Sequence, residues 1–105
     1  MTALSAGRGR RHEIEQALRR LAPRLPSHEF GSVVDHALDS PGLSTAAPES
    51  AAWLSLVAYV RHVMTDYDDM LNDGFDRDSA RFFVADETEA VLRDWGVKRK
   101  LNAED

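Results

Sequence analysis

An apolar stripe in the middle of the chain constrains the fold more than any other feature. Downstream of Pro48, apolar side chains recur at three- and four-residue intervals and would share one helical face for about five turns: Trp53, Leu56, Val57, Val60, Val63, Met64, Tyr67 and Leu71. The run Asn72-Asp73-Gly74 that follows is typical of a helix that ends at a glycine. The pattern predicts one long central helix over residues 48–72.

Three shorter segments repeat this helical spacing. They span residues 10–22, 27–39 and 76–95. Ser27 and Asp76 are the expected N-caps, because their side chains can accept hydrogen bonds from free amides of the first turn, and Gly96 is the expected stop. No segment shows the alternation of a strand. We therefore expect an all-α fold, a compact four-helix bundle in which the last two helices form an antiparallel helical hairpin and the first two pack across it.

The composition fits one domain. A chain of 105 residues can bury one modest core, and hydrophobic and charged shares of 43% and 30% are ordinary for a folded protein. We expect this helical domain at residues 10–97, between a flexible N-terminal tail at 1–9 and a mixed basic and acidic tail at 98–105. The absence of cysteine excludes disulfides and thiolate metal sites. Since there is also no signal-peptide core and no apolar run of about eighteen residues, we expect a cytoplasmic protein without a membrane segment.

Charge is unevenly distributed along the chain. The net charge is −5, and residues 27–92 carry thirteen acids against three arginines, whereas residues 1–26 carry six arginines against two glutamates. An acidic body repels nucleic-acid phosphates, so binding to DNA or RNA would have to use the terminal arginines. Nucleic-acid binding is therefore a subordinate hypothesis.

The segment from Arg61 to Asp69 is the most unusual part of the sequence. On a helix, His62 and Asp66 lie one turn apart on the face opposite the apolar stripe, so their side chains can touch. A histidine and a carboxylate so placed can form half of a metal site, or a base with the group that orients it. More often such a pair is a solvent-facing helix contact.

Two arginines in the predicted fourth helix also stand out. Arg77 and Arg81 fall on the same angular stripe as the apolar side chains that follow them, so both would point toward the packed side. The positive charge of an arginine near a helix N-terminus interacts unfavourably with the helix dipole unless carboxylates neutralise it. The hairpin would bring the aspartates of residues 66–69 close to both arginines. We expect an arginine–carboxylate network that locks the hairpin, with an anion-binding site as the alternative.

The sequence contains no diagnostic cofactor, metal or catalytic motif. If Gly74 is aligned with the central glycine of an EF-hand loop, Leu71 and Ala80 occupy the third and twelfth positions, where calcium needs oxygen ligands. Neither a phosphate-binding glycine loop nor a nucleophile with a partner base is found. We expect no cofactor, no metal and no enzymatic activity, with catalysis at the polar segment left open.

Aromatic residues bear on a partner surface. Trp53 and Phe83 lie on predicted core stripes, whereas Tyr59 and Phe82 lie off them. An exposed tyrosine and phenylalanine near each other can seed an interface with a protein partner or a second copy. Because single exposed aromatics are also common, Tyr59 and Phe82 are candidate interface residues by position alone.

Several of these residues resemble a known family. The series is Tyr59-Val60-Arg61-His62, Thr65-Asp66-Tyr67-Asp68-Asp69-Met70-Leu71, Arg77, Ala80-Arg81 and Leu92-Arg93-Asp94-Trp95. Within residues 58–95 it is similar to the uncharacterised bacterial and fungal family called domain of unknown function 2293. Membership implies a shared polar cluster of Arg61, His62, Thr65, Asp66, Tyr67, Asp68 and Arg81, to which the hairpin argument adds Arg77. It implies no activity, and the predicted helix at 27–39 lies outside the resemblance.

Three functional hypotheses remain. The leading one is a non-enzymatic module that binds a protein partner or forms a homodimer. The alternative is a small-ligand, metal or catalytic site at the base of the hairpin, in a concave pocket that His62 faces. The third is nucleic-acid binding through the terminal arginines, with an affinity that falls steeply with salt.

Overall fold

Three helices and the last helix of the chain enclose the main core, and two shorter helices lie at the far end of the third. The computed structural model describes the backbone of residues 2–105 and the side chains of residues 9–105. The helices are α1 (Thr2–Leu21), α2 (Ser27–Asp39), α3 (Pro48–Met64), α4 (Tyr67–Asn72), α5 (Arg77–Phe83) and α6 (Ala85–Asp94), with a 3₁₀ turn, η1 (Pro41–Leu43). The described chain holds no strand, so the expected all-α fold is confirmed. The four expected helices are present as six, and the exact arrangement as a four-helix bundle is not confirmed.

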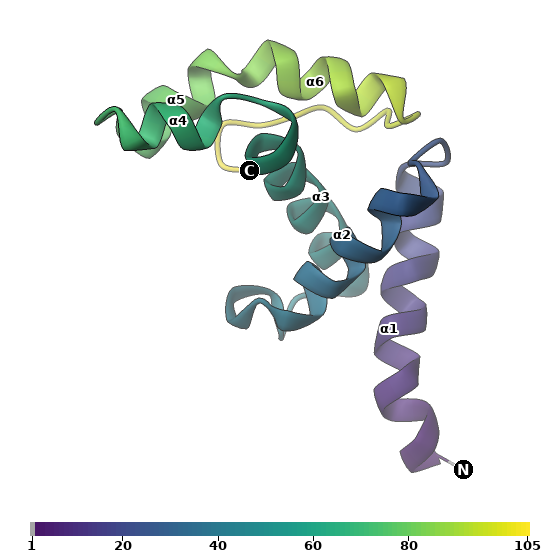
Figure 1. Cartoon of the computed structure of the whole chain (residues 1–105). Helices are drawn as coiled ribbons and strands as arrows, with labels where there is room; N and C mark the ends of the chain where they lie inside the picture. The colour runs from purple at the N-terminus through teal and green to yellow at the C-terminus, as the bar shows by residue number, and fades with distance from the viewer. Residues whose placement is uncertain (1) are drawn as a thin grey trace.

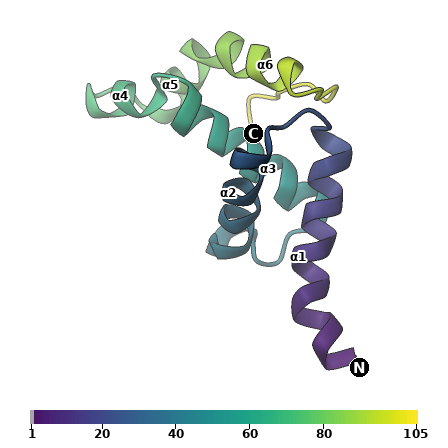
Figure 2. The ribbon, with the colours of Figure 1, turned by 45° about the vertical axis from the view of Figure 1, so that its right-hand side comes forward.

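Helix α3 links the two groups of helices (Figure 1). It packs against both α1 and α2, while α4, α5 and α6 lie together at its other end. The N-terminal end of α1 extends beyond this body (Figure 2), and the whole molecule measures 50 × 27 × 23 Å along its principal axes.

The main core lies between α1, α2, α3 and α6. Its largest fully buried side chains include Ile14, Leu18, Val33, Trp53, Leu56 and Leu92. Full burial of such a side chain contributes about 1.5–3 kcal/mol. Within this core Ser55 donates a hydrogen bond from its Oγ to the main-chain oxygen of Val33 (2.7 Å), which ties α3 to α2.

Two helix starts differ from those predicted. Helix α1 already begins at Thr2, so the backbone of most of the expected flexible tail at 1–9 is helical, and Met1 lies outside the described residues. Ser27 is the first residue of α2 instead of its N-cap, because Pro26 occupies the cap position and no side chain makes a cap hydrogen bond. The proline ring holds φ near −60° there, which sets the chain direction without a polar cap.

The central helix is shorter than predicted. Helix α3 ends at Met64, and α4 begins only after Thr65 and Asp66. Thr65 has an extended backbone, and its Oγ1 donates to the Arg61 main-chain oxygen (2.6 Å) and accepts from the Tyr67 amide (3.2 Å). A threonine hydroxyl that serves the end of one helix and the start of the next competes with a continuous helix.

A second, smaller core holds the short helices together. Its buried members are Tyr67 from α4, Ala80 from α5 and Val84, with Met70 and Leu71 packed against them. Val84 also separates α5 from α6, so the predicted fourth helix is divided at this residue. The apolar stripe of the predicted central helix is therefore divided between two cores, and its members Val63 and Met64, in the last turn of α3, are exposed.

The predicted stop and cap residues of this half are confirmed. Asp76 caps α5 by accepting a hydrogen bond from the Ser79 amide (2.8 Å). Gly74 (φ 99°) and Gly96 (φ 87°) end α4 and α6 in the left-handed region that favours glycine. Gly96 is also required sterically, because a Cβ atom would lie 3.0 Å from Pro23 Cγ.

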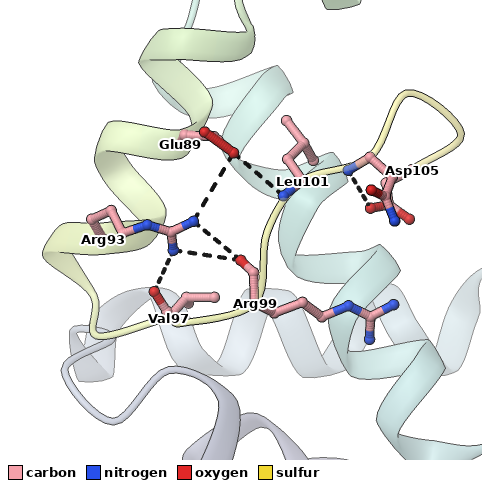
Figure 3. A network of polar contacts seen from close by, with 7 residues as sticks. Glu89, Arg93, Val97, Arg99, Leu101 and Asp105 are labelled. Carbon is pink, nitrogen blue, oxygen red and sulfur yellow. Dashed lines mark hydrogen bonds and ion pairs between the residues drawn. The ribbon is translucent and has the colours of Figure 1, made fainter.

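The segment after α6, expected as a tail, is packed against the protein (Figure 3). Arg93 donates hydrogen bonds to the main-chain oxygens of Val97 and Arg99, and Glu89 accepts one from the Leu101 amide (3.4 Å). Leu101 packs against the main core. These contacts lead residues 98–105 back from the end of α6 toward α3, where they form one wall of a pocket.

Candidate functional site

A pocket of about 820 Å³ lies between α3, α5, α6 and the C-terminal segment. Its lining residues are Arg61, Asp78, Arg81, Phe82, Ala85, Glu89, Leu101, Asn102, Ala103 and Glu104. Pockets for small molecules usually measure about 300–1,000 Å³, so this one has room for a ligand of that class. Two of its residues, Arg61 and Arg81, belong to the predicted polar cluster, and we call the site the arginine pocket.

Arg61 is the most buried charged group of the pocket. It stands in the last turn of α3 with 5% of its surface exposed. One guanidinium nitrogen, Nη1, donates to the main-chain oxygen of Asp105 (2.7 Å), whereas Nε is buried without a hydrogen-bond partner. Burial, and after it the nearby charge of Arg81, lowers the pKa of Arg61. Arg61 stays charged at neutral pH, because the ordinary pKa of a guanidinium lies far above neutral pH.

Arg81 brings a second guanidinium to the same pocket. It lies in the last turn of α5, is half-buried, and its Nε is also buried without a partner. Among the described residues neither arginine forms an ion pair with a carboxylate side chain. Two partly desolvated positive charges are thus close together without a carboxylate side chain in contact, and the nearby charge of Asp105 offsets this unfavourable arrangement at Arg61 only in part.

The expected lock between arginines and carboxylates is not seen among the described residues. The aspartates of residues 66–69 are exposed, because the break at Thr65 redirects α4 and carries them to the surface. Arg77 is exposed as well and does not line the pocket, so it does not point inward as predicted.

His62 lies outside the arginine pocket, although the sequence argument placed it inside. Its Nδ1 is 2.5 Å from Asp68 Oδ1, and its ring packs edge-on against Tyr67 with 5.4 Å between ring centroids. The predicted contact to Asp66 is replaced by Asp68, since Asp66 falls in the helix break. His62 and Asp68 are both exposed. The predicted cluster is therefore divided: Arg61 and Arg81 line the pocket, while His62, Tyr67 and Asp68 group outside it.

The two candidate interface residues lie in different surroundings. Tyr59 is half-buried and donates a hydrogen bond to Glu29 Oε1 (2.8 Å), and burial followed by this hydrogen bond raises the pKa of the phenol. Phe82 has 76% of its surface exposed and also lines the arginine pocket. Phe83, expected in the core, is exposed and packs edge-on against Phe82 and Phe75. The exposed aromatic surface is thus formed by three phenylalanines and does not include Tyr59.

Sequence reasoning missed most of the other pocket residues. Asp78, Glu89 and Glu104 contribute carboxylates to its walls, and Leu101 contributes an apolar side chain. Residues 101–104 carry no periodic signal, and their position depends on the return of the chain along α6. One feature bears on this return path: Arg93 follows Glu89 by four residues on α6, and its guanidinium contacts both Glu89 and the main-chain oxygen of Arg99.

The basic residues near the N-terminus have structural contacts. Arg10 donates to the main-chain oxygens of Leu43 and Ala46 (2.8 and 3.0 Å), and Arg11 pairs with Asp35 at 2.7 Å. These contacts join α1 to the loop after α2 and to α2 itself. Nucleic-acid binding through these arginines gains no support from this arrangement.

Two further features were searched for along the described residues. None of the described helices is long and apolar enough to cross a membrane. Within the same part of the chain, no group of three or more histidine, aspartate or glutamate side chains is arranged to hold a metal ion.

Comparison with known proteins gave one match. The model of a family described as an uncharacterized conserved protein, DUF2293, matches residues 17–96, which is about three quarters of the chain. The match is wider than the expected resemblance and includes the end of α1 and all of α2. No curated protein and no solved structure matched the chain.

Proposed function

The chain belongs to the DUF2293 family, and we propose that it binds a small anionic molecule, with Arg61 and Arg81 as the anion-binding residues of the arginine pocket. The observation that carries the proposal is that two guanidiniums line one pocket and that neither forms an ion pair with a carboxylate side chain among the described residues. An anionic group placed between the two guanidiniums would neutralise the mutual repulsion of the arginines and accept hydrogen bonds from those of their N–H groups that open into the pocket.

Arginine suits this role for a chemical reason. Its planar guanidinium presents parallel N–H groups to carboxylate or phosphate oxygens, and charge-assisted hydrogen bonds of this kind are roughly twice as strong as neutral ones. Because Arg61 is almost fully buried, its hydrogen bonds form in a medium of low polarity and compete little with water. No side chain of the pocket pairs a nucleophile with a base, so the proposal is binding and not catalysis.

Thermal unfolding in the presence of small anions tests this proposal. Acetate or phosphate, titrated at constant ionic strength, should raise the unfolding midpoint by several degrees, since an anion at ten times its Kd contributes about 1.4 kcal/mol to a single-site protein. The variant Arg81→Gln should lose this response. Arg77→Gln is the matched control, because Arg77 is an exposed arginine of the same helix that does not line the pocket. An equal response in all three proteins would contradict the proposal.

A second candidate function is self-association through the exposed phenylalanines. Phe75, Phe82 and Phe83 have 43%, 76% and 55% of their surface exposed, and the rings of Phe75 and Phe82 each pack edge-on against that of Phe83. Contiguous exposed aromatic rings are enriched at protein interfaces. Sedimentation velocity over a hundredfold range of concentration tests this candidate: a monomer–dimer equilibrium that Phe82→Ser abolishes would support it, and a monomer at every concentration would exclude it.

A further inference from the structure

The arginine pocket contains carboxylates that face its two arginines. Five charged side chains line it: Arg61, Arg81, Asp78, Glu89 and Glu104. Glu89 is already engaged, because its Oε2 accepts the Leu101 amide and lies 4.0 Å from the Arg93 guanidinium. The remaining groups are two arginines and two carboxylates that form no ion pair with one another within 4.0 Å in the described chain.

The two carboxylates are carried by different elements, and both residues are exposed. Asp78 stands in the first turn of α5, where the helix dipole stabilises its negative charge. Glu104 belongs to the C-terminal segment on the other wall. A ligand in the pocket therefore meets positive charge at Arg61 and Arg81 and negative charge at Asp78 and Glu104.

This balance of charge selects among anions. A nucleotide or another multiply charged phosphate compound would form ion pairs with the arginines. Its negative charge would also be repelled by two carboxylates that have no counter-ion in contact. A zwitterion can pair with both kinds of charged group, because it carries one positive and one negative end. Phe82, Ala85 and Leu101 supply an apolar surface for the uncharged body of such a ligand.

The C-terminal segment shows which kind of oxygen accepts a hydrogen bond from Arg61. The oxygen that contacts its Nη1, at 2.7 Å, is the main-chain oxygen of Asp105, so a carboxyl oxygen of an amino acid fits this position. The volume of about 820 Å³ exceeds that of a single amino acid and suits a molecule of two or three residues.

From the proposed anion-binding function, on which this step rests, we infer that the ligand is a short apolar peptide bound as a zwitterion. Its terminal carboxylate contacts Arg61 and Arg81 in place of the Asp105 oxygen. Its terminal ammonium contacts Asp78 and Glu104, and its apolar side chains lie against Phe82 and Leu101.

Isothermal titration calorimetry with four probes tests this inference at pH 6.5, where an α-amino group is protonated. The probes are leucyl-leucine, its N-acetylated form, its C-terminal amide, and adenosine monophosphate. Leucyl-leucine should bind most tightly. The amide should bind at least tenfold more weakly, because it lacks the charge that the arginines recognise, and acetylation should weaken binding about fivefold, as expected for partly exposed ion pairs.

Variants of the carboxylates and of Arg81 show which side chains cause each loss of affinity. The double variant Asp78→Asn/Glu104→Gln should bind leucyl-leucine and its acetylated form equally, while it keeps the penalty for the amide. Arg81→Gln should remove the penalty for the amide. The matched control is Asp86→Asn/Glu87→Gln, two exposed carboxylates in the first turn of α6 that do not line the pocket. It should behave as the wild type does.

The possible results separate this inference from the function on which it rests. If adenosine monophosphate binds more tightly than leucyl-leucine and the binding depends on Arg81, the peptide inference is overturned while anion binding stands. If leucyl-leucine binds but acetylation has no effect on its affinity, the proposed contact of the ammonium group with Asp78 and Glu104 is overturned. If no probe binds in a manner that depends on Arg81, both the inference and the proposed function are wrong.

Discussion

Arg81→Met separates a binding arginine from a structural one. Methionine keeps a long apolar side chain in place of the arginine stem but removes the guanidinium. In the wild type that guanidinium has a buried Nε without a partner, no carboxylate in contact and a second arginine nearby. A buried unsatisfied polar group costs about 1–3 kcal/mol, so its removal should more than offset the contacts that are lost.

The expected gain is up to about 1 kcal/mol in the free energy of unfolding, which corresponds to a midpoint higher by roughly 4–8 °C in a domain of this size. Circular dichroism melts at low salt measure it, with Arg77→Met as the control that should melt as the wild type does. Added salt should narrow the difference, because screening weakens the repulsion between Arg61 and Arg81 in the wild type alone. A loss of about 3 kcal/mol or more in Arg81→Met would refute the reasoning, since that is the cost of breaking a buried ion pair.

Three further substitutions test the fold that carries the pocket. Gly96→Ala should destabilise the protein by about 2 kcal/mol or more in a denaturant titration, because its positive φ disfavours a side chain and a Cβ would crowd Pro23. Ser55→Ala should cost about 1 kcal/mol by the same measurement, through loss of the buried hydrogen bond to α2; an unchanged midpoint would show that this bond is dispensable. Asp76→Ala should lower the thermal midpoint at pH 7, because the Ser79 amide loses its acceptor. Hydrogen bonds from the Ser79 backbone and side chain hold the pKa of Asp76 below its ordinary value, so this cap stabilises the fold above the unfolded pKa and loses its effect as the pH falls through the folded one. A difference between wild type and Asp76→Ala that persists at low pH would contradict the capping role.

The helical segments could be predicted from the sequence because apolar spacing reports which face of a helix is buried. The same spacing could not show the break at Thr65, since the side chains after the break are also buried, but in a different core. Tyr67 continues the stripe of Trp53 and Leu56, yet it packs with Ala80 and Val84. A stripe identifies a buried face, whereas the hydroxyl of Thr65 decides whether the helix is straight.

The candidate site could be predicted only in part, for a related reason. Arg61 and Arg81 were singled out by residue type and by family resemblance, and both line the pocket. The assignment of their partners depended on a straight helix, which would have directed the aspartates of residues 66–69 toward the arginines. The position of residues 101–104 depends on the contacts that Glu89 and Arg93 make with the C-terminal segment. That segment has no periodic apolar pattern, so the sequence could not predict the pocket.

Phe83 is exposed, although it was predicted to be buried, because the predicted fourth helix is divided into two helices. Its place on the predicted stripe assumes one continuous helix from residue 76 to residue 95, but the division at Val84 rotates the last turn of α5 relative to α6. Val84 is then fully buried while Phe83 faces outward beside Phe82. Short helices that end within one or two turns are the case in which angular position on a helical wheel is least informative.

The most direct test of anion binding in the arginine pocket is to observe the side chains of Arg61 and Arg81 by NMR. The Nε–H resonances of Arg61, Arg77 and Arg81 can be assigned with the three Arg→Gln variants and followed while acetate is added at constant ionic strength. If the pocket binds anions, the resonances of Arg61 and Arg81 shift together and saturate, because a carboxylate accepts hydrogen bonds from both arginines, whereas the resonance of Arg77 barely moves. If all three resonances shift alike and without saturation, the arginines of the pocket do not form an anion-binding site.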